Sequence, residues 1–191
     1  MDIESLITFF KKEIEKEVTI SRMEHCLRVA ALAERFALAH TYPYPRKAYL
    51  AGIVHDITKQ KKKEFHINLF QKENFNYSDL PENAYHAFSG AIYLREQFQL
   101  KDEELLSAVR NHTLGGKNLS TLDKILYTAD FLGSEYASKQ SDYQNWIQQT
   151  EKNLYFGVSL KAKTVILDLI NKKESIHTFT IFTYNEGIKL I

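Results

Sequence analysis

Residues 48–59 read Ala-Tyr-Leu-Ala-Gly-Ile-Val-His-Asp-Ile-Thr-Lys, an apolar run that ends in a histidine and an aspartate side by side. The run is typical of a buried helix, and small residues precede His55 by one and two turns: Gly52, Ala51 and Ala48. This spacing leaves room beside the imidazole for a group other than protein. A carboxylate buried against an imidazole is costly unless it is paired or bound to a metal. The stretch therefore predicts either an ion pair at a helix end, the commoner case for a lone pair, or part of a metal site.

The composition indicates one ordinary globular domain. The chain has 191 residues, of which 44% are apolar and 26% charged, and a net charge of +1 favours neither nucleic acid nor a membrane surface as a partner. We expect a single domain over 1–191, with a core of about 18–135 and C-terminal helices and a tail over about 142–191. Cys26 is the one cysteine, and the acidic start lacks the apolar region of a signal peptide. We therefore expect a cytoplasmic protein of undetermined oligomeric state that crosses no membrane.

The spacing of apolar residues predicts an all-α fold. Beside the helix that ends near His55 and one that starts at Pro81, we expect helices over about 3–14, 21–40, 65–74, 103–112, 121–130 and 142–171. Ser21 and Glu24 have the spacing of a capping box for the second of these. The tail from Ile176 to Tyr184 is rich in Thr, Ile, Phe and Tyr, which predicts a short extended segment.

Six chemically active side chains fall on the inward faces of the expected helices, and three other histidines (His40, His66 and His177) do not share this property. The six are His25, His55, Asp56, His86, His112 and Asp130. Such a set points to one or two metal ions held between helices. Imidazole and carboxylate ligands suit iron, manganese, cobalt or zinc, and such a metal supplies hydroxide for hydrolysis.

The order of these residues resembles that of the HD-domain metal-dependent phosphohydrolases. More narrowly, the chain is similar to the bacterial YqeK-type subgroup, the symmetrical diadenosine tetraphosphate hydrolases of the HD fold, over roughly residues 20–186. The resemblance rests on five motifs: Arg22-x-x-His25, His55-Asp56-x-x-Lys59, His86-x-x-x-Gly90-Ala91, His112-Thr113-x-Gly115, and Ser120-x-Leu122-Asp123-Lys124-Ile125-x-Tyr127-x-Ala129-Asp130.

The resemblance implies an HD-domain helical bundle that binds iron most readily, with manganese, cobalt or zinc as alternatives. Its implied metal ligands are His25, His55, Asp56 and Asp130, while His86 and His112 hold a second metal or substrate phosphate. Asp56, Asp130 and Lys59 would be catalytic. The implied substrate-binding residues are Arg22, His25, Asp56, Lys59, His86 and His112, with Ile176, His177, Thr178 and Thr180 over the nucleotide. Taken without the resemblance, Lys59 is a cation at a helix C-terminus and Arg22 a surface residue.

The chain departs from the subgroup after Asp130. The subgroup shows Ile-Glu-Pro-x-Arg there, whereas this chain has Gly133 in place of the glutamate and Tyr136 in place of the arginine. That arginine is expected to contact phosphate, so its loss bears on the substrate. We expect hydrolysis of diadenosine tetraphosphate to two ADP. The alternatives are an HD-domain phosphohydrolase of another nucleotide and a non-catalytic nucleotide-binding protein.

Overall fold

The structure, a computed structural model, describes residues 2–191, and all regular secondary structure in this part of the chain is helical. The elements are α1 (Ile3–Glu17), α2 (Ile20–Ala39), α3 (Pro45–Val54), α4 (Lys63–Lys72), the 3₁₀ turn η1 (Glu82–Ala84), α5 (Tyr85–Phe98), α6 (Glu103–Asn111), α7 (Thr121–Leu132), α8 (Glu135–Ser138), α9 (Tyr143–Lys152), α10 (Leu154–Lys172) and α11 (Thr178–Ile188). The predicted all-α class is confirmed.

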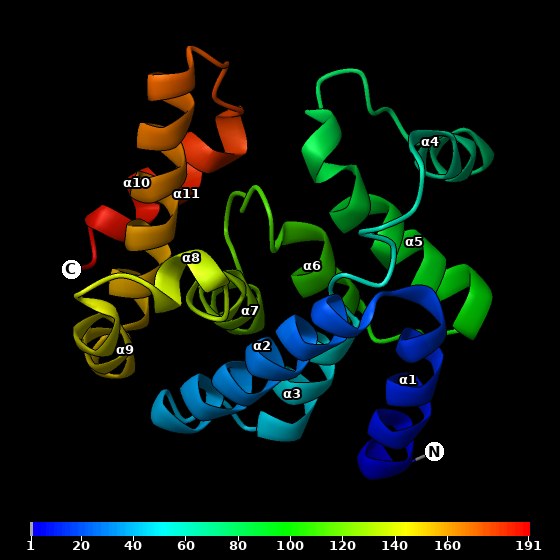
Figure 1. Cartoon of the computed structure of the whole chain (residues 1–191), viewed down its shortest axis with the longest axis horizontal. Coiled ribbons are helices and arrows are strands. Elements are labelled where there is room, and N and C mark those ends of the chain that lie inside the picture. Colours follow the sequence, from blue (N-terminus) through cyan, green and yellow to red (C-terminus); the bar gives the residue numbers. More distant parts are fainter. Residues whose placement is uncertain (1) are drawn as a thin grey trace.

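Helix α7 lies at the centre of the bundle and contacts α2, α3, α6 and α10. Figure 1 shows α2 and α3 side by side below it, α5 and α6 to the right, and α9, α10 and α11 to the left. Helix α4 packs on α5 at the edge of the bundle, and α1 packs on α3. The ends of several helices therefore face a common space beside α7.

Helix caps fix where the central helices begin. Ser120 and Asp123 form a full capping box at the start of α7, in which each side chain accepts a backbone N–H from the other residue. At α2 the expected capping box is wrong: Thr19 is the cap, and its hydroxyl accepts the N–H of Arg22 at 3.4 Å. The helix thus starts two residues earlier than a cap at Ser21 predicted.

The apolar core lies between α1, α2, α3, α6 and α7 and includes the fully buried Phe10, Phe36 and Leu126. A second, aromatic cluster around Phe70 joins α4 to α5. There the Phe70 ring lies 5.4 Å from the Tyr85 ring. These two clusters hold the helices that carry the six inward side chains.

Helices α2 and α3 approach so closely that only glycine fits at position 52. A Cβ added there would lie 2.4 Å from Cα and 2.6 Å from the backbone nitrogen of Ala30. The contact is with backbone, which cannot move aside as a flexible side chain can. Gly52 therefore lets α3 dock on α2 and bring its C-terminal end beside that helix.

The C-terminal segment is where the sequence-based expectation was wrong. Residues 178–188 form α11, whereas an extended tail was expected over Ile176–Tyr184. His177 caps this helix by accepting the N–H of Phe179 at 3.2 Å. The hydroxyls of Thr180 and Thr183 bond to Leu114 and to Gly116. These tertiary contacts outweigh the weak helix preference of threonine.

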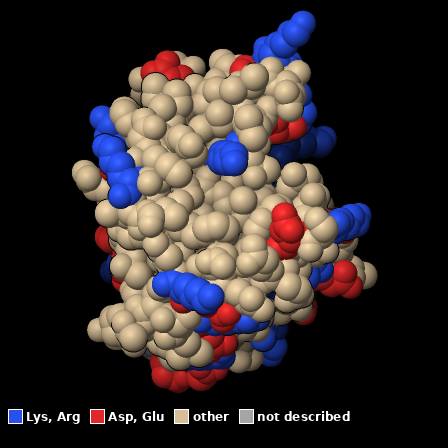
Figure 2. All heavy atoms as spheres, turned by 90° about the vertical axis from the view of Figure 1, so that its left-hand side faces the viewer, with Lys and Arg blue, Asp and Glu red and all other residues tan. Residues whose placement is uncertain are grey.

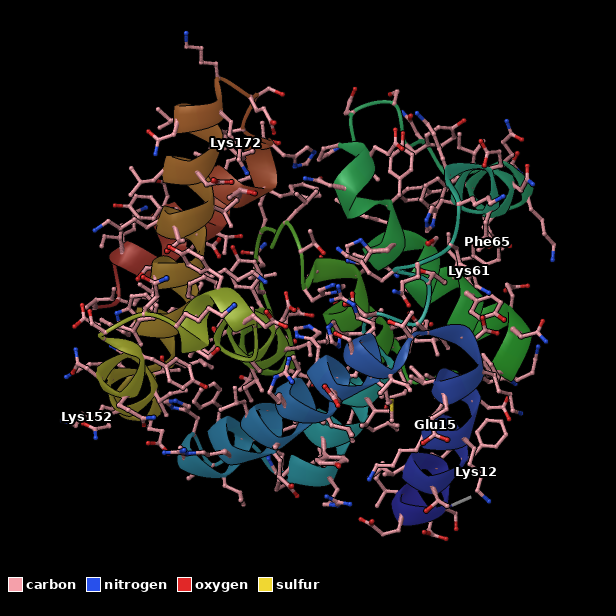
Figure 3. All side chains as sticks on the ribbon, in the orientation of Figure 1. Lys12, Glu15, Lys61, Phe65, Lys152 and Lys172 are labelled. Atoms are coloured by element: carbon pink, nitrogen blue, oxygen red, sulfur yellow. The ribbon has the colours of Figure 1, made fainter. Side chains whose placement is uncertain are left out.

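No helix in the described residues is long and apolar enough to cross a membrane. The face that carries α9 and α10 shows charged side chains separated by uncharged surface (Figure 2). Lys152, at the end of α9, projects outward (Figure 3), and Lys172, at the end of α10, pairs with Asp168. This face therefore presents no continuous basic surface.

We expect Gly52→Ala to destabilise the protein by about 3 kcal/mol, because its methyl group would overlap the backbone of Ala30. Gly90→Ala is the matched control: its Cβ would lie 3.4 Å from the Thr58 hydroxyl, an ordinary contact. Urea unfolding of both variants measures the difference. Equal stability of the two variants would contradict the close helix contact.

Candidate metal centre

Five helices bring the six predicted side chains to one place. They are His25 in the second turn of α2, His55 and Asp56 directly after α3, His86 at the start of α5, His112 directly after α6, and Asp130 in the last turn of α7. Residues that are far apart in the sequence thus share a common site.

The Asp56 carboxylate lies at the centre of this cluster. Its Oδ2 is 3.5 Å from Nε2 of His55 and 3.8 Å from Nε2 of His25. Its Oδ1 is 3.3 Å from Nε2 of His86 and 3.5 Å from Nε2 of His112. Each carboxylate oxygen therefore faces its own pair of imidazoles. Asp130 joins the pair of imidazoles that faces Oδ2: its Oδ1 lies 3.2 Å from Nε2 of His25 and 3.5 Å from Nε2 of His55.

Backbone carbonyls orient three of the rings. Nδ1 of His55 donates to the Gly52 carbonyl at 2.8 Å, and Nδ1 of His112 donates to the Val109 carbonyl at 2.6 Å. Nδ1 of His25 lies 3.3 Å from the Gly133 carbonyl and donates to it in the same way. With the proton on Nδ1, each Nε2 presents its lone pair to the centre. This is the usual outer support of a histidine metal ligand.

The donor atoms fit a metal ion. Two sets, His25–His55–Asp56 and Asp56–His86–His112, each place one ligand atom per residue within 4.8 Å of the others, and these residues are buried. Nε2 of His55 and Oδ1 of Asp56 are buried without a hydrogen-bond partner. Leaving such atoms unpaired is costly, whereas a cation in each of the two donor sets would give each of these atoms a partner. Imidazole and carboxylate together are a donor set for iron, manganese, cobalt or zinc.

The charges of the cluster are strongly coupled. Burial opposes ionisation of Asp56, but the imidazoles of His55, His86 and His112 hold the pKa of its carboxyl well below the usual value. Burial lowers the pKa of His86 well below its ordinary value and lowers that of His112. Both rings therefore favour the neutral form that binds metal. For His55, burial is outweighed by Asp56 and Asp130, which raise its pKa.

Two cations lie at the edge of the cluster. Nη1 of Arg22 donates to Oδ2 of Asp56 at 3.0 Å, so Arg22 reaches the site and is not only a surface residue. Nζ of Lys59 lies 3.3 Å from Nε2 of His86 and forms no ion pair within residues 2–191. The neighbouring Lys61 pairs with Glu17, and its ammonium lies over the Phe65 ring. Figure 3 shows Lys61 and Phe65 on the right-hand side of the molecule, near α4. Lys59 is thus the lysine of this loop that faces the site.

Lys161 belongs to the site although the sequence analysis missed it. It is buried on α10, and its Nζ donates to Oδ2 of Asp130 at 2.8 Å and to the His112 carbonyl at 2.7 Å. Burial opposes ionisation of Asp130, but Lys161, His25 and His55 hold the pKa of its carboxyl well below the usual value. The spacing contained a signal, because Lys161 follows the inward Val158 by three residues and precedes Val165 by four.

Two expectations about the other histidines and the tail need correction or refinement. His66 is buried and not outward, because its Nδ1 bonds to the Ser89 hydroxyl at 2.7 Å in the packing between α4 and α5. His177 and Thr180 line the cleft described below, whereas Thr178 faces a neighbouring hollow that His177 also lines. Ile176 is half-buried and does not line the cleft.

A cleft of about 1170 Å³ opens onto the cluster. Arg22, His25, Asp56, Lys59 and Asp130 line its inner part, and 22% of the Asp130 side chain is exposed there. The cleft is large enough for a dinucleotide-sized ligand. Fold and site together define a helical bundle with a buried histidine–aspartate centre that can hold metal and is reached through an open cleft.

Comparison with known proteins agrees with this class. The profile described as the HD domain matches residues 22–133, which include all six clustered side chains, and the chain belongs to the HD domain family.

Curated relatives cover the chain to different extents. A "Bis(5'-nucleosyl)-tetraphosphatase, symmetrical" of Halalkalibacterium halodurans is 29% identical over 91% of this chain and 92% of its own length. The protein of the same name in Bacillus subtilis is 29% identical over 90% and 92%. A "Probable nicotinate-nucleotide adenylyltransferase/Ap4A hydrolase" of Mycoplasma genitalium is 34% identical over 66% of this chain, which spans only 35% of that longer protein.

A solved structure has the same fold. It is described as a predicted HD superfamily hydrolase involved in NAD metabolism from Clostridium acetobutylicum. The two chains superpose with a TM-score of 0.86 over 95% of this chain and 96% of that one, at 24% identity. At this identity the likeness establishes the arrangement of the helices.

We expect Lys161→Met to destabilise the chelator-treated protein by about 3 kcal/mol, because it removes the cation that faces Asp130 in a buried pair. Lys163→Met, an exposed lysine on the same helix, is the control. Thermal unfolding of both variants with chelator present measures the effect. An equal melting temperature for Lys161→Met and wild type would show that the pair contributes nothing to stability.

Proposed function

We propose that this chain is a metal-dependent hydrolase that cleaves diadenosine tetraphosphate symmetrically, giving two molecules of ADP. The observation that carries the proposal is the central Asp56, whose two oxygens face two separate pairs of imidazoles at the base of an open cleft. The names of the H. halodurans and B. subtilis relatives support the substrate.

The cluster would hold one or two ions in this proposal. His25, His55, Asp56 and Asp130 would hold the first, and His86 and His112 would hold a second ion or a phosphate of the substrate. Iron is the proposed metal, with manganese, cobalt or zinc as alternatives that suit the same donors. When bound, such ions lower the pKa of water and polarise a phosphoryl oxygen. The lowered pKa values of Asp56, His86 and His112 support ligand forms that are ready to bind cations.

The cations of the cleft bind the polyphosphate. Lys59 makes no ion pair within the described residues, so its ammonium is available to a phosphate. Arg22 can exchange part of its contact with Asp56 for a phosphate oxygen. Both lie beside the cluster and offset the negative charge that develops as the phosphoanhydride breaks. Asp56 and Asp130 stay ionised and orient the attacking water by accepting its hydrogen bonds.

One nucleoside of the substrate lies near the start of α11. His177 and Thr180 line the cleft at that end, beside the turn that follows His112. Ile176 and Thr178 act indirectly in this arrangement, because they flank His177 without lining the cleft.

A free, buried Cys26 is compatible with a reducing compartment, and we place the enzyme in the cytoplasm.

A different nucleotide is the second candidate substrate. The observation in its favour is Tyr136, which lines the cleft where the related subgroup shows an arginine. A screen of dinucleoside polyphosphates and mononucleotides, with each metal added in turn, separates the two candidates.

We expect purified protein to contain a transition metal and both His55→Ala and Asp56→Ala to lose it, because each variant removes a ligand from the cluster. Asp56→Ala should lose more metal, since Asp56 belongs to both donor sets. His40→Ala, whose ring bonds to the Thr150 carbonyl outside the cluster, is the control. Elemental analysis after purification without chelator decides this. Full metal content in both site variants would refute the assignment.

We expect ADP as the sole nucleotide product from diadenosine tetraphosphate, because attack at the central bridge leaves two equal halves. Chromatography of an early time course measures the products. Equal amounts of AMP and ATP would mean asymmetric cleavage and would exclude the proposed reaction.

A further inference from the structure

Three aromatic side chains continue the wall of the cleft beyond the metal-binding cluster. Phe131 follows Asp130 directly, and its ring lies 6.1 Å from the Tyr136 ring and 6.0 Å from the Trp146 ring. All three residues line the same cleft as Asp56 and Asp130. We call Phe131, Tyr136 and Trp146 the aromatic wall.

Protein packing does not account for Tyr136. The residue is 54% exposed, and its hydroxyl makes no hydrogen bond within residues 2–191. Helix α8, which carries it, is held by other groups: the Ser134 hydroxyl caps it, and Gln140 donates to the Tyr136 carbonyl. The ring is therefore free to meet a ligand in the cleft.

The cleft reaches from the cluster to two opposite sides. Pro81, Asn83 and His86 line it on the side of η1 and α5, and the aromatic wall lines it on the side of α8 and α9. Figure 1 places the start of α5 at the upper centre, α8 left of the centre and α9 at the lower left. A ligand anchored on the cluster by phosphates can thus extend both ways.

We propose that the aromatic wall binds the second nucleobase of a dinucleoside polyphosphate, the one on the half that leaves as a nucleoside diphosphate. This inference rests on the proposed function and names a binding site within it. A dinucleoside polyphosphate has a base at each end of its anionic chain. Aromatic side chains stack on any base, and each stacked base strengthens binding by roughly tenfold. In this proposal, stacking on Tyr136 contributes to substrate binding at the position where the subgroup's arginine would contribute through its charge.

The test compares two ligands that differ by one nucleoside: diadenosine tetraphosphate and adenosine 5'-tetraphosphate. For Tyr136→Leu, which keeps an apolar side chain but lacks the ring, we expect the KM of diadenosine tetraphosphate to rise about tenfold with little change in kcat. The Ki of adenosine 5'-tetraphosphate as a competitor should change less than twofold, because its single base occupies the other end. Tyr136→Phe should rescue the KM.

Two further variants sharpen the comparison. Tyr44→Leu is the matched control, an exposed tyrosine that does not line the cleft. Tyr136→Arg restores the charge that the subgroup shows, and we expect it to raise the salt dependence of KM. Trp146, the one tryptophan of the chain, gives an independent readout: diadenosine tetraphosphate should quench its fluorescence more than adenosine 5'-tetraphosphate does.

The outcomes separate the two proposals. Cleavage of diadenosine tetraphosphate to ADP with the same KM in Tyr136→Leu and wild type overturns the aromatic wall alone. An equal rise for both ligands also overturns it, because the loss would not depend on the second base. Absence of cleavage by the wild-type protein overturns the proposed function, and the inference with it.

Discussion

The buried carboxylate of Asp56 sits between four imidazole rings, and the surrounding structure depends on keeping it ionised there. Removing a carboxylate from water is unfavourable unless nearby positive charge or hydrogen-bond donors replace the lost hydration. In this chain the Arg22 guanidinium donates to Oδ2 of Asp56 at 3.0 Å, and His55, whose pKa is raised by Asp56 and Asp130 against the effect of burial, lies 3.5 Å from the same oxygen. The helices that carry these groups are consequently constrained to end at one point.

Close helix packing makes that convergence possible. Gly52 allows α3 to dock on the backbone of α2, and its carbonyl accepts the Nδ1 proton of His55. Gly133 has a similar effect on the other side of α2: a Cβ there would lie 2.8 Å from Val29, and the Gly133 carbonyl accepts from His25. The absence of a Cβ at position 133 therefore allows this close approach to Val29. A side chain there would require Val29 to shift.

The outer part of the cleft has a different character from its base. At the base the site is densely charged, with Asp56, Asp130, Lys59 and Lys161 close to the imidazoles. Toward α8 and α9 the lining becomes aromatic and the nearby surface largely uncharged (Figure 2). This arrangement suits a ligand with an anionic centre and aromatic ends. Its anionic centre would meet the charged base of the cleft, and an aromatic end would meet the aromatic lining. In the proposed function, the outer cleft would select the substrate and the base of the cleft would carry the residues for bond cleavage.

The sequence by itself determined the helical class and the six side chains that face inward, because helical periodicity fixes which face of a helix a residue occupies. It could not determine how the faces meet. The division of the cluster into two donor sets about Asp56 depends on where five helices end in space. Lys161 was missed for the same reason. Its role as the partner of Asp130 depends on the packing of α10 beside α7, which the sequence of α10 does not show. The last segment was read as extended from its β-branched residues, yet contacts of Thr180 and Thr183 with the turn after His112 make it helical. Local preferences are worth a few tenths of a kcal/mol per residue, and tertiary contacts of this kind exceed them.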